Sequence, residues 1–361
     1  MALKVEISPE DLKFYSRLPK VHIHSHVLGM VAPETVLALA AKYKVNLGTS
    51  DPERLYAYYD FGGLVDLLSK IASVIRDEED FSRVIYEAVK ADYEQDRVLY
   101  AELFFQTSYH FLFGVRYRTL LVGFVDGLQR AERDFGVRVR LIAGINRQLP
   151  PYIATHVVRE VVANPSPYVI GIGLEDYEAF GAPEAFVEAY RLAESAGLHR
   201  TAHAGEHGPP ENIVRALTVL RCERIDHGYQ IVSDPSIAYR LAENNIHFTV
   251  CPTVAGRQGW ARADGHVLKH MRDRGLWISI NADDPAIIKT TLSREYAVAE
   301  KFMLATRAEM VALSLRAIEA TWLPEDEKRT LRDRFLVEFS ASPELRDVTL
   351  PAYRENRIGH E

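Results

Sequence analysis

Two short motifs in the middle of the chain contain the residues best suited to chemistry. The first, HAGE, runs from His203 to Glu206, and the second, DHG, runs from Asp226 to Gly228. An imidazole that can bind a metal, a carboxylic acid three residues later and a second imidazole are the groups needed to activate water and to pass a proton to a substrate nitrogen. The two motifs therefore predict a hydrolytic reaction at a nitrogen-bearing carbon.

Two histidines near the N-terminal end have the spacing of a metal site. The run from Lys20 to Val27 alternates and is rich in β-branched residues, which predicts a strand. Side chains two residues apart on a strand point to the same face, so His24 and His26 can share one ion. His22 has the same parity, and we interpret it as a core residue or as a support for a metal ligand.

A pair of carboxylates completes the predicted metal shell. The apolar run from Trp277 to Pro285 contains Asp283 and Asp284, and Asp-Asp-Pro after a strand is by itself most often a turn or a helix N-cap. Its occurrence together with the histidine motifs favours a metal site instead. Three imidazoles and one carboxylate leave room for a water and suit one catalytic Zn²⁺ per chain. The predicted ligands are His24, His26, His203 and Asp283.

Eight strand-like runs, most of them separated by helical patterns, predict the fold. Apolar strands that alternate with helices indicate a parallel sheet buried on both faces, and eight such units indicate an α/β fold of the (β/α)8 TIM barrel type. In that architecture reacting groups gather at the C-terminal ends of the strands, where the motifs fall. The predicted strands are Lys20–Val27, Arg97–Phe105, Val139–Asn146, Tyr168–Glu175, Leu198–Glu206, Arg224–Tyr229, Ile246–Pro252 and Trp277–Pro285. The predicted helices between them are Leu120–Phe135, Tyr152–Ala163, Ala182–Ala196, Pro210–Leu220, Pro235–Asn244 and Val267–Arg274.

Extra helices are expected after the first strand and at the C-terminal end. The segment between Val27 and Arg97 is too long for a simple crossover, and its position predicts a helical flap over the pocket, with a stabilising insertion as the alternative. The polar stretch from Ser342 to Glu361 is expected to wrap the surface or to fray. The amphipathic or helical stretches outside the repeated units are Pro33–Tyr43, Leu64–Arg76, Ser293–Ala320 and Pro324–Ser340.

The composition limits the classes of partner. The chain has 361 residues, 47% hydrophobic and 26% charged, without a Pro/Gly/Ser-rich linker, so we expect one domain over residues 1–361. A formal net charge of −7 argues against nucleic acid, which requires a basic face. The sequence contains no signal-like or membrane-spanning apolar run, so a cytoplasmic location without a membrane partner is expected. Only Cys222 and Cys251 are present, which implies no disulfide framework.

From about Leu18 to Ser340 the chain resembles the adenosine deaminase family of metal-dependent aminohydrolases. The resemblance rests on the first-strand motif that ends at Gly29, on HAGE, on the motif around His227 and on Ile280–Pro285. It implies zinc-dependent hydrolytic deamination of an adenosine-like or other aminated purine or heterocycle, with release of ammonia. The implied roles are metal ligands for His24, His26, His203 and Asp283, proton shuttle for Glu206, catalytic histidine for His227 and purine contact for Asp284.

The residue types agree with that reaction. Water bound to Zn²⁺ has its pKa lowered from about 15.7 to about 7, which makes hydroxide available near neutrality. His227 can orient this water and accept its proton. Glu206, which we expect burial to keep partly protonated, can donate to a ring nitrogen. Asp283 can stabilise the developing hydroxyl as well as the metal.

Two departures from the family pattern concern the substrate. Leu28 precedes Gly29 where the family has an acid that the resemblance assigns to a sugar hydroxyl, so we expect Leu28 to offer apolar surface and unmodified adenosine not to be the best substrate. Asp176 stands where the family has a glycine whose backbone N–H meets the purine, and Gly173 where it has an aspartate. Asp176 or Glu175 could therefore accept hydrogen bonds from a donor-rich ring edge, with a solvated acid at the strand end as the alternative.

A third departure and two other functions stay open. Asp226 replaces a glycine and is interpreted either as a partner of His227 or as a surface turn residue. A two-metal hydrolase of cyclic amides or esters would need a bridging lysine or carboxylate after the fourth strand, where Glu175 is the only candidate. A catalytically inactive purine-binding protein would be expected to lose a ligand or Glu206, and the sequence retains them all.

Overall fold

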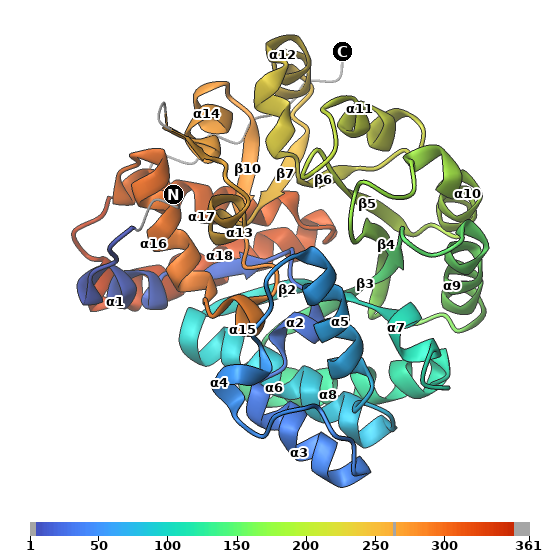
Figure 1. Ribbon diagram of the computed structural model, residues 1–361. Helices are drawn as coiled ribbons and strands as arrows, with labels where there is room; N and C mark the ends of the chain where they lie inside the picture. The colour runs from blue at the N-terminus through green and yellow to red at the C-terminus, as the bar shows by residue number, and fades with distance from the viewer. Residues whose placement is uncertain (1–4, 263–264, 350–361) are drawn as a thin grey trace.

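The computed structural model describes residues 5–262 and 265–349, and its centre is an eight-stranded parallel sheet curled into a barrel (Figure 1). The strand order β1-β2-β3-β4-β5-β6-β7-β10 follows the chain, as the alternation of apolar strands and helices predicted. The (β/α)8 prediction is confirmed. The strands are β1 (Lys20–His22), β2 (Val98–Phe105), β3 (Arg138–Asn146), β4 (Val169–Glu175), β5 (His199–Ala204), β6 (Arg224–His227), β7 (His247–Val250) and β10 (Trp277–Ile280).

The barrel closes between β1 and β10 through a few polar contacts. The Ile23 amide donates to Oδ1 of Asn281 at 2.9 Å, and the His26 amide donates to the carbonyl of Asp283 at 2.9 Å. These contacts replace a regular ladder, so β1 ends at His22 rather than at Val27 as predicted, and helix α2 (Val27–Met30) follows at once. The closure fixes the segment that carries His24 and His26 against the loop that carries Asp283.

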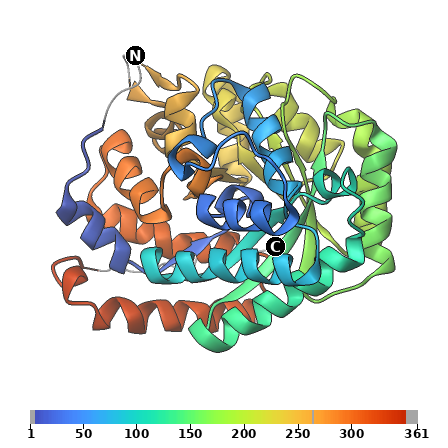
Figure 2. The same cartoon turned by 60° about the horizontal axis from the view of Figure 1, so that its bottom comes forward.

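The insertion after β1 contains α3 (Pro33–Tyr43), α4 (Pro52–Leu55), α5 (Phe61–Ala72) and α6 (Glu78–Asp96). The long helix α6 was not predicted, because its sequence is rich in acidic and polar residues. Asp77 and Asp80 form a capping box at its start. It packs on α8 (Tyr117–Phe135) where Gly123 and Gly127 allow close approach: an added Cβ would lie 2.4 Å from the carbonyl oxygens of Glu78 and Ser82, respectively. Figure 2 shows both helices on the outside of the barrel.

The remaining crossover helices match the six predicted ones within a few residues. They are α8, α9 (Pro151–Ala163), η1 (Pro183–Phe186) with α10 (Val187–Ser195), α11 (Glu211–Thr218), α12 (Pro235–Glu243) and α14 (Val267–Asp273). Shorter elements are α1 (Pro9–Arg17), α7 (Thr107–Phe111), η2 (Tyr229–Ser233), α13 (Pro252–Arg257), α15 (Pro285–Ile288) and the β8–β9 hairpin (Ala261–Arg262 and Gly265–His266). Among the residues that the structure describes, none of the helices combines the length and the apolar character needed to cross a bilayer.

The C-terminal helices cover the barrel from outside. They are α16 (Leu292–Met303), α17 (Arg307–Arg316), η3 (Ala317–Ala320), α18 (Glu325–Ala341) and η4 (Pro343–Leu345). Of the last stretch, predicted to wrap the surface or fray, residues 342–349 are described and Leu345 is buried, whereas residues 350–361 lie outside the described part. Buried apolar side chains form a hydrophobic core cluster, and Cys222 and Cys251 are free thiols within the fold.

Candidate active site

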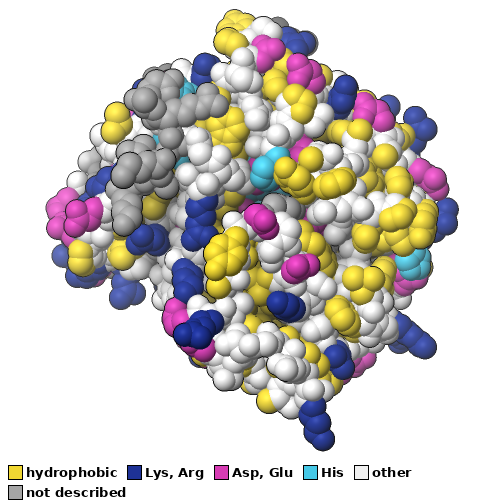
Figure 3. Space-filling view, viewed as in Figure 1, with side chains coloured by type: hydrophobic (Ala, Val, Ile, Leu, Met, Phe, Trp, Pro, Cys, Tyr) yellow, Lys and Arg dark blue, Asp and Glu magenta, His cyan; other side chains and the backbone are white. Residues whose placement is uncertain are grey.

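The predicted chemical residues meet at the C-terminal ends of the strands, around a cavity of about 470 Å³. This face of the molecule is hollowed, and histidine atoms are visible in the hollow between apolar side chains (Figure 3). Tyr56, Tyr58, Leu64 and Leu68 line the cavity from the insertion, so part of the insertion covers the pocket as predicted. The chemical residues that line it are His26, His203, Glu206, His227, Asp283 and Asp284.

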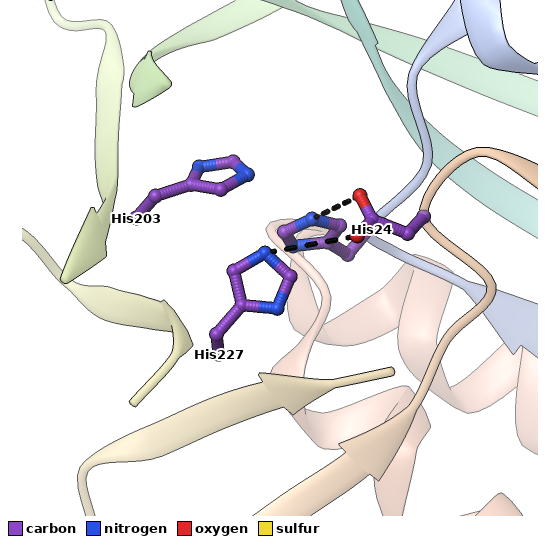
Figure 4. A group of neighbouring side chains, drawn as sticks. His24, His203 and His227 are labelled. Carbon is purple, nitrogen blue, oxygen red and sulfur yellow. Dashed lines mark ion pairs between the residues drawn. The ribbon is translucent and has the colours of Figure 1, made fainter. Parts of the chain in front are cut away.

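Ligand-type atoms of His24, His203, His227 and Asp283 lie within 4.8 Å of one another, and all four residues are buried. Figure 4 shows the three imidazoles pointing toward a common centre. His26 joins this group through Asp283, since its Nε2 lies 3.2 Å from Oδ1 of Asp283, compared with 3.4 Å for Nε2 of His24. The Nε2 atom of His227 lies farther away, 3.9 Å from Oδ2 of Asp283.

The donor set fits a metal ion. Nε2 of His24 is buried without a hydrogen-bond partner in the structure, which is the state expected of a nitrogen whose partner is a cation. Nδ1 of His203 lies 3.0 Å from the carbonyl of Leu174, an acceptor that places the proton on Nδ1 and leaves the Nε2 lone pair free. Imidazoles and one carboxylate in a buried shell form the nitrogen-rich set that zinc prefers.

A carboxylate supports each histidine of the first motif. Nδ1 of His24 lies 3.1 Å from Oδ1 of Asp226, and Nδ1 of His26 lies 3.2 Å from Oε2 of Glu175. Both contacts are on the far side of the ring from Asp283, so they orient the ring and increase the basicity of Nε2. Asp226 is fully buried and contacts His24 rather than His227, so both sequence-based interpretations of this residue were wrong.

Two glycines make room for groups below the histidines. A Cβ on Gly144 would lie 2.2 Å from Oε1 of Glu175, so only glycine admits that carboxylate. A Cβ on Gly173 would lie 2.3 Å from the Phe104 ring, which packs under His24 and His26 with ring centroids 5.2 and 5.0 Å apart. The glycine that departs from the family pattern thus provides space for an aromatic floor.

His227 occupies a strained position at the end of β6. Its φ is 65°, and that of Asp283 is 61°; both lie in the left-handed region that non-glycine residues adopt only when the surroundings enforce it. Nδ1 of His227 lies 3.1 Å from the Tyr229 hydroxyl, which donates to the Cys251 carbonyl. The hydroxyl therefore accepts from Nδ1–H, and Nε2 of His227 faces the cavity as a proton acceptor.

Glu206 lies between several donors at the cavity wall. Nε2 of Gln258 donates to its Oε1 at 2.5 Å, and Nε2 of His227 lies 3.9 Å from its Oε2. Burial raises the pKa of Glu206, but the nearby His227 and His207 lower it by more than burial raises it. The net pKa is therefore below the usual glutamate value. Burial acts in the direction expected for a partly protonated Glu206, and the neighbouring imidazoles oppose it, so the group can start as a carboxylate that takes up a proton.

The loop that carries Glu206 is held by Glu178, a residue that the sequence analysis did not single out. The Glu178 carboxylate accepts the backbone N–H groups of residues 205, 206, 207 and 208 at 2.8 to 3.0 Å, and Nδ2 of Asn212 at 2.9 Å. Four further residues that contact the site were not predicted. The Thr249 hydroxyl lies 2.7 Å from Nδ1 of His24, and Nε2 of Gln106 lies 2.5 Å from Nδ1 of His26. The other two are Tyr229 and Gln258, which contact His227 and Glu206. They lie within, at the end of or after predicted strands, where polar residues are common, so no sequence pattern distinguished them.

The predicted substrate contacts have different outcomes. Asp284 lines the cavity. Gly29 does not line it but makes room for Asp284, because a Cβ there would lie 1.9 Å from Oδ1 of Asp284. Leu28 is 2% exposed, packs in the hydrophobic core and does not line the cavity. The expectation that it offers apolar surface to a substrate was therefore wrong. The chain turns into α2 at this point, which directs the Leu28 side chain into the core. Asp176 lines the cavity from the end of β4.

Comparisons with known proteins agree with this geometry. A family model described as adenosine deaminase matches residues 19–337. The adenine deaminase of Streptomyces coelicolor is 34% identical over 332 residues, which are 90% of this chain and 95% of that protein. The crystal structure of adenine deaminase from Arthrobacter aurescens has 30% identity and a TM-score of 0.84, covering 90% of this chain and 99% of that one. An amidohydrolase from Burkholderia ambifaria, solved with bound Zn, has 31% identity and a TM-score of 0.86, covering 96% of both chains.

Proposed function

The chain belongs to the adenosine deaminase family, and on that premise we propose that it removes the amino group of a free purine base, adenine or a close relative, with the help of one Zn²⁺. The observation that carries the proposal is the buried ring of imidazoles around Asp283, which opens on a cavity lined by Glu206, His227 and Asp284. The choice of a free base is supported by the relatives named adenine deaminase.

The proposed ligands of the ion are His24, His26, His203 and Asp283. When bound, zinc would supply a water acidic enough to act as the nucleophile near neutrality. His227 has its Nδ1 proton engaged by Tyr229, so its Nε2 can orient that water and accept its proton. In this assignment His227 is the catalytic neighbour rather than a ligand, because its Nε2 lies farther from Asp283 than that of His26.

Glu206 moves the proton in the proposed reaction. It begins as a carboxylate held by Gln258, takes up a proton beside His227 and can deliver it to a ring nitrogen next to the amino-bearing carbon. Protonation of that nitrogen makes the carbon electrophilic, and the oxygen of the activated water adds to it. The amino group then takes up the proton of the new hydroxyl and leaves as ammonia, so that the carbon–nitrogen bond is replaced by a carbonyl. Asp284 lines the same cavity and is proposed to contact the ring.

The two-metal alternative is disfavoured by Glu175. Its Oε2 lies beside Nδ1 of His26, the nitrogen on the far side of the ring from Asp283, so this carboxylate supports a ligand instead of bridging two ions. The inactive-protein alternative is disfavoured because the structure brings Glu206, His227 and all four predicted ligands together.

Ammonia release from a panel of aminated heterocycles tests the proposal. We expect the zinc-loaded protein to deaminate adenine faster than adenosine, 5′-deoxyadenosine, guanine and pterins. Elemental analysis should give about one metal per chain, and chelation should abolish activity that added zinc restores. A stoichiometry near two, or no ammonia from any purine at full metal loading, would contradict the proposal.

A further inference from the structure

Two carboxyl groups that line the cavity lack the partners that buried charges need. Oδ2 of Asp176 and Oδ1 of Asp284 are both buried without a hydrogen-bond partner. Among the described side chains of residues 5–349, which exclude residues 61 and 261–264, no lysine, arginine or histidine forms an ion pair with either group. Asp284 is 8% exposed and Asp176 is half-buried, with its Oδ2 atom buried. Glu175, which also lines the cavity, is 2% exposed and has a further unpartnered oxygen.

Asp176 is held so that one oxygen stays free. The Tyr109 hydroxyl donates to Oδ1 of Asp176 at 2.8 Å, which fixes the carboxylate and leaves Oδ2 without a donor. The backbone of Asp176 has φ 71°, a conformation that favours glycine and that aspartate tolerates better than most residues. Both the strained backbone and the single tether point to a carboxylate that is positioned for a ligand.

Buried acceptors without donors destabilise a protein unless a ligand supplies the missing hydrogen bonds. The unpartnered Oδ1 of Asp284 packs against Gly29, which does not line the cavity, so the acceptor that a ligand in the cavity can satisfy is Asp176. Such a ligand must carry an N–H donor. A free purine base has a ring N–H in its five-membered ring, in either tautomer, whereas a sugar or methyl group on N9 removes it. Burial raises the pKa of Asp176, and the nearby charge of Glu175 raises it further. An N–H donor from the ligand would oppose both effects, because it stabilises the charged carboxylate.

We propose that Asp176 is a specificity-determining acceptor that selects aminated bases with a free ring N–H over the same bases substituted at N9. This inference rests on the proposed function and assigns the basis of its substrate preference to a residue of this chain. It also predicts which change removes the preference while the ammonia-releasing machinery stays intact.

The test compares adenine with 9-methyladenine in the wild-type zinc protein and in Asp176→Asn. Asparagine has the same size, tolerates the left-handed backbone and can still accept from Tyr109, but it replaces one acceptor oxygen by a donor. We expect the wild type to favour adenine by at least about tenfold in kcat/KM and the variant to lose about tenfold of that preference. Since the bulk of the methyl group is the same in both proteins, the change in the ratio reports on the hydrogen bond.

A second variant and a matched control separate this role from a general defect. Tyr109→Phe keeps the carboxylate but releases its tether, and should reduce the preference partly. Asp333→Asn makes the same charge change on an exposed residue of α18 and should leave the ratio unchanged. Thermal unfolding of each variant shows whether the fold is intact, and metal content shows whether the proposed metal ligands are intact.

The outcomes distinguish the inference from the function on which it rests. If wild type uses both compounds equally, or if Asp176→Asn keeps the wild-type ratio, Asp176 is not the selector although deamination stands. If neither compound releases ammonia, the proposed function fails, and calorimetric binding of adenine and 9-methyladenine to the same proteins decides the inference instead. A ratio of dissociation constants that is near one in wild type, or equal in wild type and variant, overturns it.

Discussion

Oδ1 of Asp226 lies 3.1 Å from Nδ1 of His24, while its other oxygen lies 3.7 Å from Nδ1 of His203. The same carboxylate accepts the hydroxyls of Thr201 and Thr249 at 2.7 and 2.8 Å. Burial raises the pKa of Asp226, but His24, and with it His203 and Arg224, lower it well below the usual range. One buried anion thus holds the His24 ring and acts on His203 through its charge, while the Leu174 carbonyl orients His203.

Asp226→Asn should weaken metal binding while the barrel stays folded. The amide keeps the size but loses the charge that raises the basicity of His24 and His203, and removal of such a support typically costs about 10- to 100-fold in metal affinity. Competition with a chromogenic chelator measures the affinity. Asp92→Asn is the matched control, because Asp92 makes the same kind of contact with His22, at 2.9 Å, away from the shell. Equal metal affinity of wild type and Asp226→Asn would refute the role.

Much of the barrel could be predicted because its strands are apolar and its crossover helices are amphipathic. The two errors have local causes. Strand β1 is short because its segment leaves the ladder to contact the Asp283 loop, a choice made by residues more than two hundred positions away. Helix α6 was not predicted because its many polar residues obscure the apolar periodicity of the face that packs on α8. The close approach of the two helices also depends on Gly123 and Gly127 of α8, not on residues of α6.

The site was predictable where a motif fixes both residue type and spacing. His24, His26, His203 and Asp283 come together as expected, and His22 is satisfied by Asp92 and by the Ala282 amide, which fits a core or supporting histidine. The supports were not predictable, because the partner of Asp226 depends on which strands are neighbours and on which way each side chain leans. Leu28 shows the same limit: it stands two residues after His26, which lines the cavity, but the turn into α2 buries its side chain in the core.

Glu206→Gln should lower kcat by about 10²- to 10⁴-fold, since the amide keeps the size of the side chain but cannot take up and deliver a proton. Metal content should stay near the wild-type value, because Glu206 is not among the proposed ligands. Steady-state ammonia release together with elemental analysis checks both. Near-normal turnover of this variant would show that the proton follows another route.

Glu178→Gln should reduce both stability and turnover. One amide cannot accept four backbone N–H groups and Asn212, so the loop that carries Glu206 loses hydrogen bonds to a charged acceptor, at a cost of about 2–4 kcal/mol. Urea denaturation and kcat measure the two effects. Glu188→Gln is the control, because Glu188 forms an exposed ion pair with Arg159 and its replacement should change stability by less than about 0.5 kcal/mol. Equal stability of the two variants would show that the Glu178 carboxylate does not hold the loop that carries Glu206.

Glu295 should make the stability of the protein depend on pH. It is fully buried on α16, accepts the Thr253 amide at 2.7 Å and the Thr290 hydroxyl at 2.6 Å, and burial raises its pKa from 4.5 to about 7 despite these bonds. Between these two values the folded protein binds more protons than the unfolded chain, so the contribution is complete below pH 4.5 and is lost as the pH rises through 7. Urea denaturation at a series of pH values should show the unfolding free energy of wild type falling relative to Glu295→Gln across this window, by up to roughly 3 kcal/mol. A difference between the two proteins that stays constant from pH 4 to pH 8 would mean that folding leaves the pKa of Glu295 unchanged, because its threonine donors offset the effect of burial.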